Sequence, residues 1–151
     1  MTVDVYTETT WKSPRRKTGL AAYIIVVRYN GHEDFTEKKL CQMKEATMQE
    51  AELFITALAL GKAAGMARIA EQKQINIISS NKWVGSMAAN LPNWQKNGWK
   101  NAKGEDVKYK EWWEVIAKAS DKKDLMWIPE HEQGSGVDGY QKWLKEQLER
   151  R

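Results

Sequence analysis

The stretch NWQKNGWKNAKGEDVKYKEWWEVI, residues 93–116, combines bulky aromatic side chains with positive charge. It holds four tryptophans and five lysines, set among Asn, Gln and Gly. Its five lysines face only two acids, Glu105 and Asp106, before residue 110. Tryptophan rings can back the sugars of a nucleic acid while lysines neutralise its phosphates. This composition therefore indicates a nucleic-acid surface.

A second basic run, WKSPRRK at residues 11–17, supports the same interpretation. It carries Lys12, Arg15, Arg16 and Lys17 with no acid, and the whole chain has a formal net charge of +4. A mildly basic balance weakly favours a polyanionic partner. Either run alone is more simply explained as a solvated loop. Two such runs, both with embedded tryptophans, favour nucleic-acid binding.

Length and composition set the class of protein. A chain of 151 residues with no internal repeat or linker predicts one domain over 1–151. Cys41 is the single cysteine, so no internal disulfide is possible, which fits a reducing compartment. No window approaches the roughly 20 apolar residues of a membrane span, and the first residues lack a signal-peptide core. We expect a cytoplasmic protein without membrane contact; the sequence predicts no particular oligomeric state.

The first part of the chain reads as three strands. Residues 2–11 alternate apolar and polar side chains, and 19–30 form an apolar, β-branched run typical of a buried strand. Asn30-Gly31 is a strong hairpin signal, so the more polar 32–43 is expected to return as a half-exposed strand.

The hydrophobic period then changes to that of a helix over 46–65. Thr47 followed by Glu50 makes a capping box, and Gly65 is a plausible C-cap. One apolar stripe is expected on this helix, with Leu53, Phe54, Ala57, Leu58, Leu60 and Ala64. The short strand 74–79 follows, and a strand–helix–strand order favours a right-handed crossover into a parallel neighbour.

The remaining elements complete a mixed sheet. They are a helix over 81–91 that Pro92 ends, a helix over 106–120, a strand over 124–129, a Gly-rich loop over 130–139 and a closing helix over 140–151. The order β-β-β-α-β-α-α-β-α predicts an α/β domain whose five-stranded sheet has three antiparallel strands and two parallel additions.

This order and the 93–116 stretch resemble the type 1 ribonuclease H family over nearly the whole chain. In that family a W-K-x-N-G-W-K pattern, followed by K-P-V-x-N-x-D-L-W, forms a basic protrusion that grips the DNA strand of an RNA/DNA hybrid. The positions that match are Trp94, Lys96, Asn97, Gly98, Trp99, Lys100, Val107, Lys108 and Trp112. The resemblance implies a ribonuclease H-like fold with a protrusion, here called the handle, over about 93–110. Lys103 of the handle, and Lys12, Arg15 and Arg16 of the 11–17 basic run, are further candidates for nucleic-acid binding.

A second match lies at the start of the predicted helix. ATMQEAEL, residues 46–53, resembles the family pattern T-x-N-x-x-E-L. The resemblance places Thr47 against a phosphate and Gln49 where an asparagine reads the minor groove. It places Glu52 on the catalytic glutamate. Without this match, Thr47 is a plain helix cap and Glu52 a solvated helix residue.

Three further matches concern the other catalytic positions of the family. YTETT, residues 6–10, lies on F-T-D-G-S, so Glu8 falls on the first catalytic aspartate. Residues 77–84 lie on T-D-S-x-Y-V, so Ser80 falls on the second. Residues 127–140 lie on the W-V-x-G-H loop and the helix after it, where His131 matches the histidine that assists product release and Asp138 the last carboxylate.

These substitutions change the chemistry that the resemblance implies. Family catalysis uses two metal ions about 4 Å apart, and Mg²⁺ demands near-ideal oxygen geometry. Here the implied metal ligands are Glu8, Glu52 and Asp138, for Mg²⁺ or Mn²⁺ if the protein is active. Glu8 moves its oxygens outward by about 1 Å relative to an aspartate, and Ser80 removes a charge. Asp124 and Glu132 are candidates for a compensating acid.

Three functions follow from the resemblance. The first is a protein that binds an RNA/DNA hybrid or similar duplex, with hydrolysis impaired or absent. The second is an active, metal-dependent endoribonuclease with an altered acidic site. The third is a ribonuclease H-like scaffold for protein contacts. Charge reversal in the handle separates the third from the others, and turnover separates the first two.

Overall fold

The computed structural model describes residues 2–13, 18–28, 33–69, 71, 73–79, 82–129 and 139–149, with backbone alone for 11–13, 18, 122 and 129. Five strands form one sheet in the order β3-β2-β1-β4-β5. They are β1 (Thr2–Ser13), β2 (Thr18–Arg28), β3 (Phe35–Met43), β4 (Gln74–Ser79) and β5 (Asp124–Pro129). The predicted Asn30-Gly31 turn lies outside the described residues.

The strand directions confirm the predicted mixed sheet. β1 pairs antiparallel with β2, and β2 pairs antiparallel with β3. β1 pairs parallel with β4, and β4 pairs parallel with β5. In this register Glu8 lies opposite Ala22, and Thr7 lies opposite Ser79 at the last residue of β4. The central strand β1 therefore runs on past the end of β4, which leaves one side of β1 without a strand partner from β4 there.

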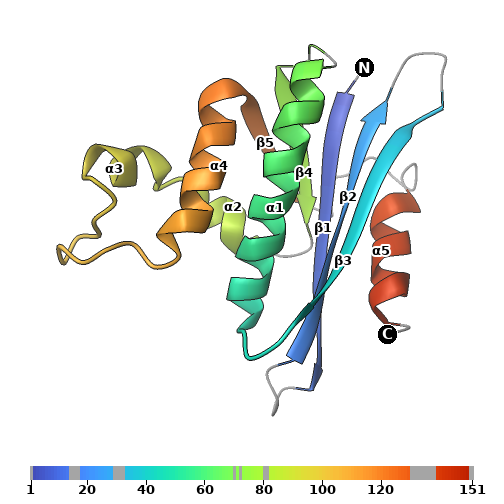
Figure 1. Cartoon of the computed structure of the whole chain (residues 1–151), viewed down its shortest axis with the longest axis horizontal. Coiled ribbons are helices and arrows are strands. Elements are labelled where there is room, and N and C mark those ends of the chain that lie inside the picture. The colour runs from blue at the N-terminus through green and yellow to red at the C-terminus, as the bar shows by residue number, and fades with distance from the viewer. Residues whose placement is uncertain are drawn as a thin grey trace.

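Helices cover both faces of the sheet. α1 (Met48–Ile69) and α4 (Lys110–Lys122) lie on one side, and α5 (Gly139–Glu149) lies on the other (Figure 1). Val3 and Val5 belong to the buried cluster on the α1 side, whereas Tyr6 packs with Leu144 and Leu148 of α5. Alternate residues of β1 thus face opposite layers, as the strand period requires. None of the described helices is long and apolar enough to cross a bilayer.

Helix α1 begins as predicted but ends later. The Thr47 Oγ1 accepts a hydrogen bond of 3.1 Å from the Glu50 backbone N–H, which confirms Thr47 as the helix cap. The helix continues to Ile69, so the prediction of Gly65 as its C-cap is wrong. The expected single stripe is also too narrow, because α1 packs against both the sheet and α4. Its small residues Ala51, Ala59 and Ala63 are buried there together with its large apolar residues.

Gly65 offers a stability test within α1. A Cβ built at this position meets no atom within 4 Å, and the surrounding backbone is helical. We expect Gly65→Ala to raise the free energy of unfolding by about 0.5–1 kcal/mol, because alanine loses less backbone entropy on folding. Urea denaturation measures the change. Gly98→Ala is the matched control: Gly98 has φ +66°, so the same substitution should destabilise there, and a gain at Gly98 would contradict the argument.

The segment around Pro92 differs from the prediction. Instead of one helix over 81–91, the chain forms α2 (Trp83–Ala88) and α3 (Leu91–Lys96). Pro92 lies in the first turn of α3, where its missing N–H has no partner to lose, so it begins a helix instead of ending one. The predicted helix over 106–120 likewise begins later, at Lys110.

Candidate nucleic-acid interface and carboxylate site

The predicted handle is a helix followed by a closed loop, and it projects from the body of the domain (Figure 1). α3 ends at Lys96, and Gly98 follows two residues later with a φ of +66°. Trp99 N donates to Trp94 O at 2.7 Å, and Gly98 N donates to Gln95 O at 3.4 Å. These two bonds form the C-terminal motif that glycine favours after a helix. Trp99 also has a positive φ, so the chain turns sharply at Gly98-Trp99.

Local hydrogen bonds close the loop beyond Trp99. Val107 N donates to Trp99 O at 3.0 Å, and Asn101 Oδ1 accepts from the backbone of Lys103 and Glu105. The Lys100 ammonium lies 2.5 Å from the Asp106 carboxylate, and this hydrogen bond and charge hold the pKa of Asp106 below its usual value. These hydrogen bonds and this ion pair within the loop form its own framework and hold its conformation.

A cluster of aromatic rings packs where the handle joins the body of the domain. Trp113 is 2% exposed, and its ring lies 5.3 Å from that of Trp94 and 6.1 Å from that of Trp83. Of the two adjacent tryptophans on α4, Trp113 faces inward. Trp112 is half-buried and stacks on Tyr109, with ring centroids 5.1 Å apart. These rings hold the handle's position on the domain.

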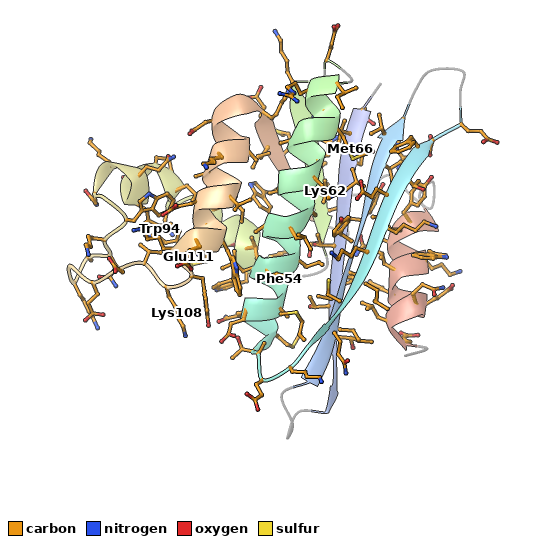
Figure 2. The ribbon with its side chains drawn as sticks, viewed as in Figure 1. Phe54, Lys62, Met66, Trp94, Lys108 and Glu111 are labelled. Carbon is orange, nitrogen blue, oxygen red and sulfur yellow. The ribbon has the colours of Figure 1, made fainter. Side chains whose placement is uncertain are left out.

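Lysines extend from this aromatic base into solvent. Lys96, Lys103 and Lys108 are exposed, and Figure 2 shows Lys108 pointing away from the domain while Trp94 lies between the handle and α4. Trp94 and Trp99 are half-buried, so part of each side chain is accessible to a ligand. The handle thus presents cations on a rigid support.

A cavity of about 280 Å³ joins the handle to the start of α1. Thr47 and Gln49 line it from α1, and Trp94, Lys108 and Tyr109 line it from the handle side. Burial, with a hydrogen bond to Glu50, raises the pKa of Tyr109 to about 12. Residues predicted to bind nucleic acid from two separate stretches therefore lie around one hollow.

Glu8 lies on the α5 side of the sheet. It is 6% exposed, and its carboxylate Oε2 accepts a short hydrogen bond from the side-chain amide of Gln141 on α5. The same Gln141 nitrogen donates to Thr7 O at 3.2 Å. The carboxylate is thus buried against a neutral amide donor, which offsets part of the cost of removing it from water.

Glu52 approaches the sheet from α1, on the other side. It is 2% exposed, and its Oε1 accepts a hydrogen bond of 2.9 Å from the Ser79 hydroxyl at the end of β4. Glu52 and Ser79 line a cavity of about 250 Å³ together with Lys82 and Ser86. The two acids therefore flank the carboxyl end of β4, one from each face of the sheet, which is where open α/β sheets place ligands.

Several predicted residues cannot be placed with these two acids. Ser80, His131, Asp138, Arg15 and Arg16 lie outside the described residues, as does the side chain of Lys12. Asp124 is described, and the expectation that it compensates for the missing charge is wrong. It begins β5 opposite Gln74, whereas Ser79 lies five residues further along β4, roughly 16 Å away at the strand rise.

Structure adds two residues that sequence reasoning missed. Gln141 belongs to the closing helix and carries no family motif, and its partner Glu8 is 133 residues away. The family pattern points to Ser80 at this place, whereas the alternation of β4 directs its neighbour Ser79 to the α1 side. In the sequence, Gln141 could have been recognised only as a polar residue in the first turn of the closing helix.

Among the described residues, the groups around Glu8 and Glu52 do not fit a pair of metal ions. Over the described ranges, which omit 80–81 and 130–138, no group of three His, Cys, Asp or Glu side chains could hold a metal. Among the contacts of the two acids are an amide N–H on Glu8 and a hydroxyl on Glu52, whereas a magnesium ion requires several oxygen ligands in octahedral geometry.

The mixed sheet, with two helices on one face, one on the other and a basic protrusion, is the ribonuclease H fold. A model of the RNase H family matches residues 2–140. The chain belongs to the RNase H family, whose members generally use a divalent metal ion.

Individual relatives agree with this assignment. The chain is similar to Ribonuclease H of Actinobacillus pleuropneumoniae serotype 5b (strain L20), with 30% identity over 125 residues, 83% of this chain and 74% of the relative. Ribonuclease H of Pelobacter propionicus is 30% identical over 111 residues, 72% of this chain and 62% of the relative.

Solved structures show the same fold. The foamy viral protease-reverse transcriptase in complex with dsDNA aligns with a TM-score of 0.72 and 22% identity, over 97% of this chain and 90% of that one. The solution structure of the PFV RNase H domain aligns with a TM-score of 0.67 and 24% identity, with the same shares of 97% and 90%.

Proposed function

We propose that this protein binds an RNA/DNA hybrid or similar duplex through the handle and the adjoining cavity, with hydrolysis impaired or absent. The observation that carries this proposal is the handle itself. Its lysines Lys96, Lys103 and Lys108 are exposed on a buried aromatic base around Trp113, next to Thr47 and Gln49. Fixed cations beside aromatic rings suit a phosphate backbone.

Membership of the RNase H family supports the substrate class. Foamy viral protease-reverse transcriptase, which shares the fold, has been solved with dsDNA and with RNA/DNA hybrid. The departures at the acidic site support impaired hydrolysis, because Glu8 and Glu52 are each hydrogen-bonded to a neutral donor and Ser80 stands where the family has an aspartate. On this proposal the domain grips its ligand without a complete acidic site.

A binding and cleavage experiment on the same labelled hybrid tests the proposal. We expect gel retardation whose logarithmic affinity falls with logarithmic salt at a slope of about −3, from three or four neutralised phosphates. We expect no cleavage in Mg²⁺ or, separately, in Mn²⁺. Cleavage that Glu52→Gln abolishes would overturn the impaired site in favour of an active endoribonuclease. A hybrid that is not retarded at any salt concentration would overturn the binding function.

A further inference from the structure

We propose that the side-chain amide of Gln141 takes the place of a cation against Glu8, so that this carboxylate is closed to Mg²⁺ and Mn²⁺. The inference deepens the proposed function, on which it rests, by naming the residue that separates this acidic site from a metal centre. It concerns residues that the structure places in direct contact. Gln141 acts here as a positioning residue for Glu8.

The contact uses the donor side of the amide. Gln141 is 3% exposed, and its Nε2 donates to both Glu8 Oε2 and Thr7 O. An amide nitrogen has two N–H bonds, so both are used. The Gln141 Oε1 has no hydrogen-bond partner among the described residues, so the two N–H bonds decide the amide's orientation.

In that orientation the amide competes with a metal ion for the contacted oxygen and offers the ion no ligand of its own. A metal accepts lone pairs from oxygen, whereas an amide N–H presents a partial positive charge and has none to give. Turning the amide over would aim Oε1 at Glu8, with two electronegative oxygens facing each other and both hydrogen bonds lost. A carboxylate that is 6% exposed needs a partner, and the amide supplies one that is permanently present.

The helix that carries Gln141 is held firmly against the sheet. The Tyr140 ring lies 5.7 Å from the Tyr6 ring, and its hydroxyl donates to Asp34 at 2.8 Å. Leu144 and Leu148 are almost fully buried one and two turns further along. α5 therefore cannot draw the amide away from Glu8 without breaking its own contacts, and an incoming ion has to displace it.

Gln141→Glu tests the proposal, with Gln147→Glu as the matched control. Both change the same residue type on the same helix, but Gln147 is half-buried and six residues further along. The probe is Mn²⁺ alone, followed by electron paramagnetic resonance and by the thermal midpoint with and without the ion. No nucleic acid is present, so the result stands apart from hybrid binding.

In wild type and Gln147→Glu, Mn²⁺ should leave the midpoint unchanged. In Gln141→Glu the midpoint should fall without metal, because two carboxylates then face each other, and should recover in millimolar Mn²⁺. Its affinity for Mn²⁺ should exceed that of wild type by about ten- to a hundredfold, the usual effect of residues around a metal ligand.

Two results would overturn the proposal. One is a folded Gln141→Glu variant with no gain in Mn²⁺ affinity. The other is Mn²⁺ binding by wild type that Glu8→Gln abolishes, and this measurement decides the question even if Gln141→Glu does not fold. Failure of wild type to retard a hybrid would overturn the proposed function while leaving these metal measurements intact.

Discussion

Reversing the charges of Lys96 and Lys103 together should weaken hybrid binding by about a hundredfold near 0.1 M salt. Each lysine that neutralises a phosphate contributes roughly eightfold at that salt concentration through counterion release, and reversal adds repulsion. Both side chains are exposed on the handle, at the end of α3 and in the loop beyond it. The slope of affinity against salt should become shallower by about two units.

Lys96 and Lys103 are better targets than Lys100. Lys100 is paired with Asp106 in the handle's own framework, so its reversal would disturb the fold of the loop as well as its charge. The double variant Lys118→Glu, Lys142→Glu is the matched control, because these lysines are exposed on α4 and α5, outside the handle. Each Lys→Glu substitution lowers the formal net charge by two, so both double variants lower it from +4 to zero.

Comparison of the two double variants gives a clear decision. Weakening confined to the Lys96 and Lys103 variant supports the handle as the binding surface. Equal weakening in both would show that net charge, and not the handle, drives association. Unchanged hybrid binding in the handle variant would refute the handle as the binding surface.

Trp113→Ala should lower the free energy of unfolding by about 3–5 kcal/mol, a large share of the stability of an ordinary domain. Trp113 is 2% exposed and contacts the rings of Trp83 on α2 and Trp94 on α3. Its removal leaves a cavity at the point where the handle joins the body. Guanidinium denaturation followed by circular dichroism measures the loss of stability.

Trp143→Ala is the control for this prediction. Trp143 is 37% exposed on α5, and its ring contacts the Lys38 ammonium at 4.5 Å. A partly exposed contact of this kind contributes about 0.5–1 kcal/mol, so the control should remain close to wild type. Similar losses at both tryptophans would refute the role of Trp113 as the buried support of the handle.

Some features of this protein follow from local chemistry and could be predicted. The β-branched run of β2 and the change of hydrophobic period at α1 predicted the mixed sheet and its helix. Thr47 was predicted as the cap of α1 because a hydroxyl before a helical run satisfies a free backbone N–H. Of two adjacent tryptophans on one helix, one has to face the core, and that residue is Trp113.

Other features depend on packing between distant segments. Gly65 reads locally as the end of a helix, yet α1 continues to Ile69 because the sheet and α4 bury it from two sides. Pro92 reads as a helix stop, but it serves equally well in a first turn, and only the path of the chain decides between the two.

The amino-acid sequence by itself determined the family, the order of the strands along the chain and the basic handle, because these depend on residue type at short spacing. The tertiary structure alone decided the surroundings of the two acids. Glu8 meets Gln141 from 133 residues away across one face of the sheet, and Glu52 meets Ser79 on the other. Such contacts arise when helices dock on opposite faces of a sheet, and no local pattern in the chain records which polar groups will then meet.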